Sequence, residues 1–259
     1  MRSFFVALQT EGLKIRKSKV IWITMAAFTM APFMAGFFMF VLKDPELAKN
    51  AGLLGAKAQI AGEANWPSYL SLYAQMIAVG GILVFGFVTS WIFGREYTDK
   101  TAKDLLALPY SRSVIIIAKF TASFITNIIL TIYIVTLGFF IGWIIGLPQW
   151  SFEIVIHGVY ILIVVTILTI VLTTPVAFFA SYGRGYLAPL GFVVFMLVLS
   201  QIVAAAGFGA YFPWAIPALY SGVTVGDNVL GWSGLFIILT TSLLGFFSTI
   251  YWWLFADQY

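Results

Sequence analysis

The 259-residue chain contains no cysteine, only one histidine, and few charged residues, which make up 9% of it. Without cysteine there is no disulfide framework, thiol catalysis or thiolate metal site. A single histidine leaves little for imidazole-based zinc binding or acid–base chemistry, so no metal site is expected. A water-soluble globular protein is excluded as well, because about a quarter of the residues in such proteins are charged.

Hydrophobic residues make up 61% of the chain and aromatic residues 18%. The hydrocarbon core of a bilayer is ~30 Å thick, and a helix needs about 20 residues to cross it. Six nearly uncharged runs are long enough. They predict an all-α integral membrane protein with six transmembrane helices in a single domain, residues 1–259. The runs are Val20–Leu42, Leu70–Phe93, Val114–Ile145, Ile154–Ala180, Tyr186–Ala206 and Ser233–Ala256.

The 14 Lys and Arg residues are distributed unevenly between the segments that join these runs. If both termini face the cytoplasm, 11 of them lie inside and three outside. Positively charged loops stay on the cytoplasmic side, so the sequence predicts a multi-pass protein of the cytoplasmic (inner) membrane with both termini inside. The basic residues flank apolar runs and form no stripe with interleaved aromatics, so nucleic acid is not an expected partner.

Residues 1–19 precede the first run and carry a cluster of basic side chains near their end. Anionic lipid headgroups attract each such cation by ~1 kcal/mol. The segment is therefore expected to form an interfacial connecting helix that lies against membrane lipid. Its candidate residues are Glu11, Lys14, Arg16 and Lys17.

Residues 94–113 join the second and third runs and are expected to form a cytoplasmic coupling loop. From Asp99 to Leu108 polar and apolar residues follow a helical spacing, and Pro109 ends the pattern. A short amphipathic helix of this kind is a docking element for another protein. Lying flat on the bilayer is the alternative, because a short basic amphipathic helix binds lipid unaided.

Residues 207–232 precede the last run and combine six aromatic side chains with two prolines and a single charge. A free aqueous loop is not expected with this composition. The segment is predicted to form short re-entrant helices in the outer leaflet, where aromatic rings sit well and protein shields the freed backbone groups. An ordinary aromatic belt at the ends of two spans is the alternative.

The cores of the six runs contain no clear ionisable group, whereas gradient-driven carriers usually need such groups to bind an ion or relay a proton. Lys119, near the start of the third run, is expected to lie at the membrane interface. Interhelical hydrogen bonding explains most of the polar side chains in the runs. The residues considered for a transport pathway are Asn127, Gln201, Tyr211, Phe212 and Trp214.

No nucleotide-binding motif of the form G-x-x-x-x-G-K-[ST] occurs in the chain. If ATP powers this protein, ATP and Mg²⁺ bind to a separate subunit, and the chain itself needs no cofactor. Proteolysis within the membrane would require a Ser/His pair, two aspartates or an HExxH helix, and none is convincingly spaced. The chain is therefore not expected to be an enzyme or to hold catalytic residues.

Three stretches of the chain resemble a known family of membrane proteins. The first is the run Glu11-Gly-Leu-Lys-Ile-Arg-Lys-Ser18, and the third is Tyr211-Phe-Pro-Trp-Ala-Ile-Pro-Ala-Leu-Tyr220. The second follows the second hydrophobic run and comprises Glu96, Thr101, Leu105, Leu106, Pro109, Ser111, Arg112 and Lys119. In these stretches the chain resembles permease subunits of type-2 ABC exporters, especially the small ones of bacitracin-resistance and lantibiotic-immunity transporters. Ala102 departs from the pattern, because a glycine is common there.

The resemblance implies that the loop between the second and third spans docks on a cytoplasmic ABC ATPase subunit, present in two copies. It also implies that Glu96 helps to anchor this loop and that a second permease chain, identical or related, completes the pathway. Arg184, in the short loop before the fifth span, is expected to make a secondary contact with the ATPase. Alternatively, Arg184 is only a positive charge in a tight turn that helps to set the membrane topology of the chain.

The sequence is therefore interpreted as the membrane-spanning permease subunit of an ATP-driven ABC exporter. The expected substrate is amphipathic or lipid-like, with an antimicrobial peptide as the example, because an uncharged, aromatic set of spans accepts apolar cargo from the membrane. Two alternatives remain open: a gradient-driven secondary carrier, and a membrane scaffold subunit that transports nothing.

Overall fold

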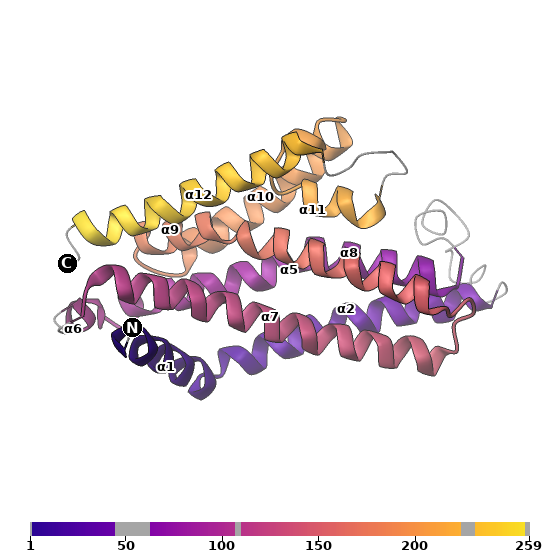
Figure 1. Cartoon of the computed structure of the whole chain (residues 1–259), viewed down its shortest axis with the longest axis horizontal. Coiled ribbons are helices and arrows are strands. Elements are labelled where there is room, and N and C mark those ends of the chain that lie inside the picture. The colour runs from indigo at the N-terminus through magenta and orange to yellow at the C-terminus, as the bar shows by residue number, and fades with distance from the viewer. Residues whose placement is uncertain (1, 45–62, 107–109, 224–230, 257–259) are drawn as a thin grey trace.

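The computed structural model of the chain describes residues 2–44, 63–106, 110–223 and 231–256. In these residues all regular secondary structure is helical, and the long helices run side by side along one axis (Figure 1). The elements are α1 (Arg2–Lys17), α2 (Val20–Lys43), α5 (Trp66–Thr98), α6 (Ala102–Leu106), α7 (Arg112–Ile145), α8 (Phe152–Val171), α9 (Thr174–Tyr182), α10 (Leu187–Ala205), η1 (Gly209–Tyr211), α11 (Ile216–Ala218), η2 (Leu219–Val223) and α12 (Trp232–Phe255).

Six segments of the described chain are long and apolar enough to cross a membrane, which confirms the all-α integral membrane fold predicted from the sequence. The fourth segment, Phe152–Tyr182, combines α8 and α9. The second begins earlier than predicted, at Trp66, because Pro67 suits the first turn of a helix and the Asn65 side chain accepts a hydrogen bond from the Ser68 amide.

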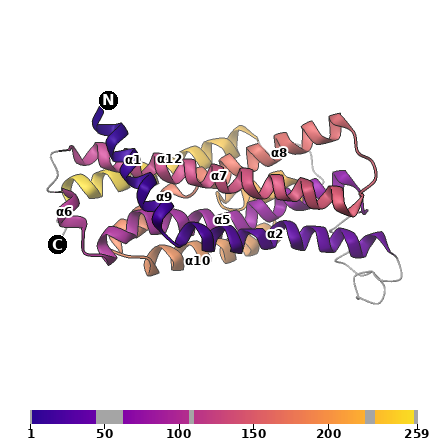
Figure 2. The same cartoon turned by 90° about the horizontal axis from the view of Figure 1, so that it is seen from below.

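The chain ends and α6 lie at the same end of the bundle (Figure 1 and Figure 2). The last turn of α2, the first turn of α5 and the link from α7 to α8 lie at the opposite end. An even number of spans returns a chain to the side on which it began. The side of the membrane on which the termini lie stays a prediction.

Helix α5 is the centre of the bundle and packs on α2, α7, α8, α9 and α10. Its aromatic side chains fit against glycines of α7. The Tyr69 hydroxyl donates a 2.8 Å hydrogen bond to the Gly138 carbonyl, and a Cβ atom at Gly142 would lie 2.7 Å from the ring of Trp66. Small residues let two membrane helices approach closely. In this bundle, buried aromatic rings of α5 fill the space beside the glycines of α7.

The fourth span is broken at Leu172 and Thr173, between α8 and α9, and Pro175 lies in the first turn of α9. Proline has no amide hydrogen, so a helical hydrogen bond is lost at this point. The Thr174 hydroxyl oxygen lies 3.0 Å from the Val171 carbonyl and 2.7 Å from the Ser242 carbonyl of α12. A side chain thus compensates for the broken backbone, as a membrane interior requires.

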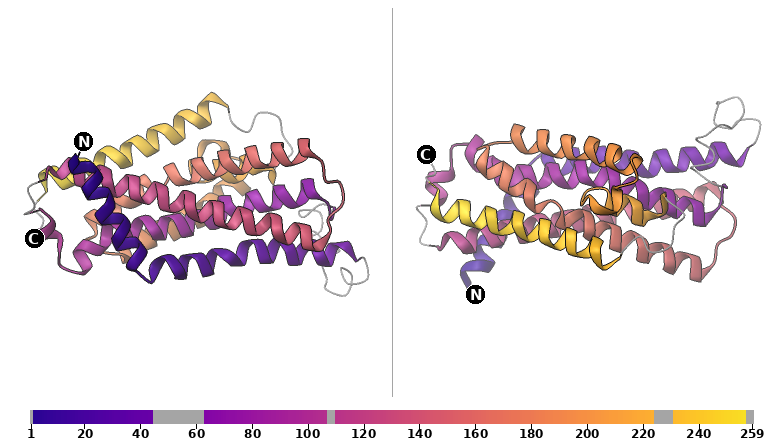
Figure 3. Two further views of the ribbon diagram at one scale, coloured as in Figure 1. Left: turned by 60° about the horizontal axis from the view of Figure 1, so that its bottom comes forward. Right: turned by 90° about the horizontal axis from the view of Figure 1, so that it is seen from above.

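The segment between α10 and α12 folds back against the bundle in η1, α11 and η2 (Figure 3). Trp214 is buried in a hydrophobic cluster with Ile82 of α5, Val193 of α10 and Ile238 of α12. The short helices predicted for residues 207–232 are therefore present in the described part of that range, while residues 224–230 lie outside it. An aromatic belt alone would leave Trp214 on the surface.

Alanine at Gly245 is expected to destabilise the bundle. A Cβ atom there would lie 2.7 Å from the Thr174 carbonyl carbon and 2.7 Å from Pro175 Cα, so the backbones of α9 and α12 would have to separate. Overpacking of this kind costs about 1–3 kcal/mol. We expect Gly245→Ala to lower the melting temperature of the detergent-purified protein, and Gly191→Ala, which meets nothing within 4 Å, to leave it unchanged or raise it.

Candidate functional site

The candidate site is built around the end of α5 and the turn that leads into α6. Lys100 adopts a left-handed conformation with φ 57°, the Lys100 amide donates to the Tyr97 carbonyl, and the Thr101 amide donates to the Glu96 carbonyl over 2.9 Å. This pair of bonds is the Schellman arrangement that ends helices, usually with glycine at the left-handed position. It explains why α6 begins at Ala102, three residues after the predicted start.

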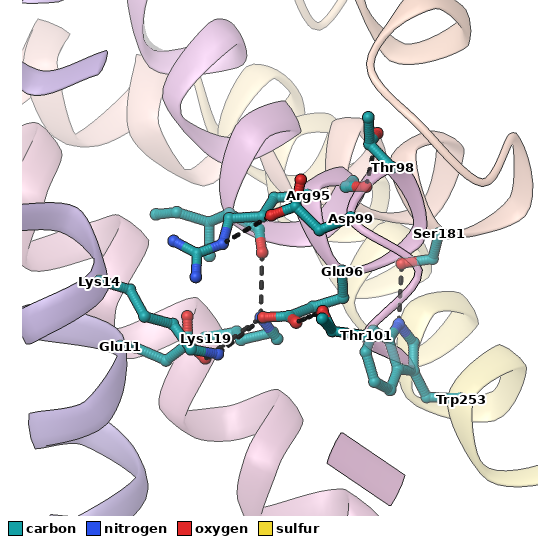
Figure 4. A network of polar contacts seen from close by, with 12 residues as sticks. Glu11, Lys14, Arg95, Glu96, Thr98, Asp99, Thr101, Lys119, Ser181 and Trp253 are labelled. Carbon is teal, nitrogen blue, oxygen red and sulfur yellow. Dashed lines mark hydrogen bonds and ion pairs between the residues drawn. The ribbon is translucent and has the colours of Figure 1, made fainter. Parts of the chain in front are cut away.

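Four charged side chains converge beside this turn, as Figure 4 shows, and we call Glu11, Lys14, Glu96 and Lys119 the charge ring. The Lys14 ammonium nitrogen lies 2.9 Å from Glu11 Oε1 and 2.7 Å from Glu96 Oε1. The Lys119 nitrogen lies 3.2 Å and 3.1 Å from the same two oxygens. Each cation therefore bridges both carboxylates, and the ring is electrically neutral.

Three of the four members of the charge ring are buried, and Lys14 is partly exposed. Lys119 is 0% exposed, Glu96 2% and Glu11 5%. The Lys119 ammonium group also donates to the Ile92 carbonyl over 3.0 Å. Lys119 is thus enclosed by protein, because α1 covers this part of α7 and supplies the Glu11 carboxylate. Its placement at the level of the membrane interface stays a prediction.

The charge ring joins helices that are far apart in the sequence. Glu11 and Lys14 come from α1, Glu96 from α5 and Lys119 from α7. The second oxygen of Glu96 accepts a 2.7 Å hydrogen bond from the Thr101 hydroxyl, directly before α6. One carboxylate thus fixes both the helix α1 and the entrance to α6.

Lys14 is the ring member closest to water, and its pKa follows from two opposing effects. Burial alone lowers the pKa of the Lys14 ammonium group, but the Glu11 and Glu96 carboxylates outweigh burial and raise the pKa above its usual value. Lys14 therefore stays protonated at physiological pH.

Helix α6 presents two different faces. Ala102 is buried and Leu105 packs against the hydrophobic core, whereas Lys103 and Asp104 are exposed. The backbone of Leu106 ends the helix, and Pro109 lies outside the described residues. The exposed face of α6 is the part of this turn that another protein can contact.

Two other predicted coupling residues lie where α7 begins. Ser111 is exposed at the N-cap of α7. The Arg112 guanidinium donates to the Trp253 and Leu254 carbonyls over 3.2 Å and 3.3 Å. A cation at the last carbonyls of a helix stabilises its end, so Arg112 fastens α12 to the start of α7.

Arg184 lies in the turn between α9 and α10 with a φ angle of 51°, and its side chain is exposed. The adjacent Gly185 carbonyl oxygen would lie 2.7 Å from a Cβ atom at Gly94 of α5. This close approach brings the Arg184 turn against the end of α5, near the charge ring. On α1, Arg16 and Lys17 are exposed, in contrast to Glu11 and Lys14.

The residues considered for a pathway have different surroundings. Phe212 and Trp214 lie together, with ring centroids 5.7 Å apart, whereas Tyr211 is 69% exposed. Gln201 is exposed on α10. Asn127 is fully buried on α7, and neither polar atom of its amide has a hydrogen-bond partner among the described residues. A buried amide without a hydrogen-bond partner is energetically costly. Of the residues considered for a pathway, Asn127 therefore has the strongest reason to bind a further polar group.

Sequence reasoning selected all four members of the charge ring but did not join them. A lysine seven residues inside an apolar helix is the signal for the ring, because an intramembrane charge normally has a partner. The contact of Arg112 with α12 was missed, and no sequence spacing indicates it.

Removing the Lys119 charge is expected to leave two buried carboxylates with a single cation. Breaking a buried ion pair costs about 3–5 kcal/mol, because an uncompensated charge remains. We expect Lys119→Met to lower the melting temperature of the purified protein strongly and Lys17→Met, at an exposed site, to have little effect. The double variant Lys119→Met/Glu96→Gln should regain part of the melting temperature that Lys119→Met loses. If the double variant regains none of it, or if Lys17→Met lowers the melting temperature as much as Lys119→Met, the ring is contradicted.

Comparison with known proteins agrees with this architecture. The family model described as "ABC-2 family transporter protein" matches residues 7–200, which include the charge ring, α6 and most of α1. The chain is similar to the bacitracin transport permease protein BCRB of Bacillus licheniformis, with 28% identity over 171 residues that cover 66% of this chain and 82% of that protein. Because this family model matches residues 7–200 of the 259, the protein belongs to the ABC-2 family of transporter proteins.

Proposed function

We propose that the chain is the permease subunit of an ATP-driven exporter in which α6 receives the movement of a cytoplasmic ATPase. The proposal is carried by the charge ring, which joins the turn before α6 to α1, α5 and α7 through one buried carboxylate. A displacement of α6 also displaces α1, α5 and α7. If these helices stayed in place, the ion pairs of the charge ring would break and leave unpaired charges in apolar surroundings, which is costly. The helices therefore move with α6 as a rigid body.

The chain is a membrane subunit of an ABC transporter by family, and such a subunit works with an ATPase chain. We propose two copies of that ATPase, holding ATP and Mg²⁺, and a second permease chain. Both termini and α6 share one end of the bundle, and most Lys and Arg residues of the sequence belong to segments at that end (Figure 1). The positive-inside rule favours the cytoplasm for this end.

An amphipathic or lipid-like substrate, such as an antimicrobial peptide, is proposed for two reasons. The relative from Bacillus licheniformis carries the name of a bacitracin transport permease. In addition, α10 and α12 expose many large apolar side chains, among them Phe195, Phe236 and Phe247. Such surfaces suit contact with lipid, a second permease or a substrate that enters from the membrane.

Charge reversal on the exposed face of α6 is expected to separate the two subunits. We expect Asp104→Arg to reduce co-purification of the partner ATPase about tenfold while leaving the melting temperature of the permease unchanged, because Asp104 is exposed. Glu153→Arg, an exposed acidic residue in the first turn of α8, is the matched control and should leave co-purification intact. Full recovery of the ATPase with Asp104→Arg would contradict docking on α6.

Transport by the reconstituted complex tests direction and substrate. Vesicles containing both subunits should move labelled bacitracin or a short-chain fluorescent phospholipid away from the ATPase side when ATP is added, and should not do so with a non-hydrolysable analogue. Movement of a hydrophilic dye alone would refute the substrate class. Movement without ATP that follows an ion gradient would favour a secondary carrier.

A further inference from the structure

A groove of about 400 Å³ opens where α1, α2 and α7 meet. Helix α1 lies across α7 and leads into the start of α2, as the left view of Figure 3 shows. The groove lies on the other side of α1 from the charge ring: Gly12 and Arg16 line it, while Glu11 and Lys14 point into the ring. It is therefore separate from the coupling contacts described above.

The walls of the groove suit an apolar chain. Helix α7 contributes residues from Ala122 to Ile129, a length of ~10 Å along the helix, and α2 contributes Trp22 and Met25. The one hydroxyl among the lining residues, that of Thr126, already donates to the Ala122 carbonyl over 2.7 Å. The walls thus offer apolar surface and no unused hydroxyl donor.

The charge at this groove is positive. Arg16 is the only charged residue among those that line it, and Lys17 and Lys19 are exposed nearby in the sequence. Arg16 forms no hydrogen bond or ion pair within the part of the chain that the structure describes. Glu11, the acidic residue of α1, is already paired with Lys14 and Lys119. An anion beside Arg16 would therefore meet an uncompensated cation.

We propose that this groove binds one anionic phospholipid, with an acyl chain between α2 and α7 and the headgroup phosphate on Arg16. Charge complementarity selects an anionic headgroup, because a guanidinium binds phosphate oxygens with two parallel hydrogen bonds. The apolar walls select a lipid over a free phosphate ion. The exposed indole of Trp22 beside the groove is typical of a side chain at the level of lipid headgroups.

A lipid in this position acts on the charge ring through α1. It fills the space beside α1 and between α2 and α7, while the ring holds the Glu11 and Lys14 face of α1 on α7. Anionic lipid is therefore expected to raise the melting temperature of the permease, independently of any ATPase or transported substrate. This inference does not rest on the proposed function.

Native mass spectrometry of the full-length permease with added lipid tests the charge. We expect the wild-type chain to retain one phosphatidylglycerol and to lose phosphatidylcholine. Arg16→Gln should weaken phosphatidylglycerol binding about fivefold, the ratio that corresponds to ~1 kcal/mol for one cation at a lipid surface. Lys17→Gln, which removes an exposed cation outside the groove lining, should change binding less than twofold.

A second pair of variants tests the groove itself. A Cβ atom at Gly12 meets nothing within 4 Å, so Gly12→Leu folds without strain and places its side chain in the groove. We expect this variant to lose the retained phosphatidylglycerol and its thermal stabilisation. Gly191→Leu on α10 has equally open surroundings and should retain both.

Three results would overturn the lipid site. Equal phosphatidylglycerol binding by wild type, Arg16→Gln and Gly12→Leu would show that the lipid binds elsewhere. Displacement of the lipid by glycerol phosphate would indicate a site for the anion alone. Conversion of a dimer to a monomer by Gly12→Leu, without any lipid preference, would show that a second copy of the chain occupies the groove.

Discussion

The structure depends most on four charged side chains, three of them buried, that neutralise one another. Glu11, Lys14, Glu96 and Lys119 draw together a helix before the first span and the ends of two long spans, at a place where water is nearly excluded. A buried ion pair adds little stability compared with an apolar pair of the same size, but separating its members is expensive. The arrangement therefore fixes one geometry more than it strengthens the fold.

The remaining parts of the candidate site follow from that geometry. Because Glu96 also accepts a hydrogen bond from Thr101, the exposed face of α6 has a defined position relative to the spans. Because Glu11 and Lys14 turn one face of α1 inward, the opposite face keeps Arg16 on the surface and leaves the groove against α7. The proposed protein contact on α6 and the proposed lipid contact on α1 are thus connected through the same carboxylates.

The bundle itself uses a different set of rules. Glycines of α7 accept the aromatic rings of α5, and the Thr174 hydroxyl compensates for the backbone bond that Pro175 removes. Close packing and satisfied backbone groups replace the hydrophobic effect as the reasons for helices to associate in lipid. The outer faces of α10 and α12 take little part in this packing and remain available to lipid or a second chain.

The sequence by itself determined the class of protein, the six spans and the segment that becomes α6. These features depend on local quantities: the length of each apolar run, the distribution of basic residues, and the helical spacing before Pro109. The same residues also marked α1 as a separate amphipathic segment. The length of α6 was predicted less well, because the left-handed conformation of Lys100 delays its start and glycine, the usual indicator of such a turn, is absent.

Only the tertiary structure decided which charges pair and which remain exposed. Glu11 and Lys119 are separated by more than a hundred residues, and no periodicity in the sequence relates them. Lys119 is buried because α1 folds over α7, and Arg112 is occupied because α12 ends beside it. Burial and pairing of a charge depend on neighbours brought together by packing, and the local pattern of a helix carries no information about them.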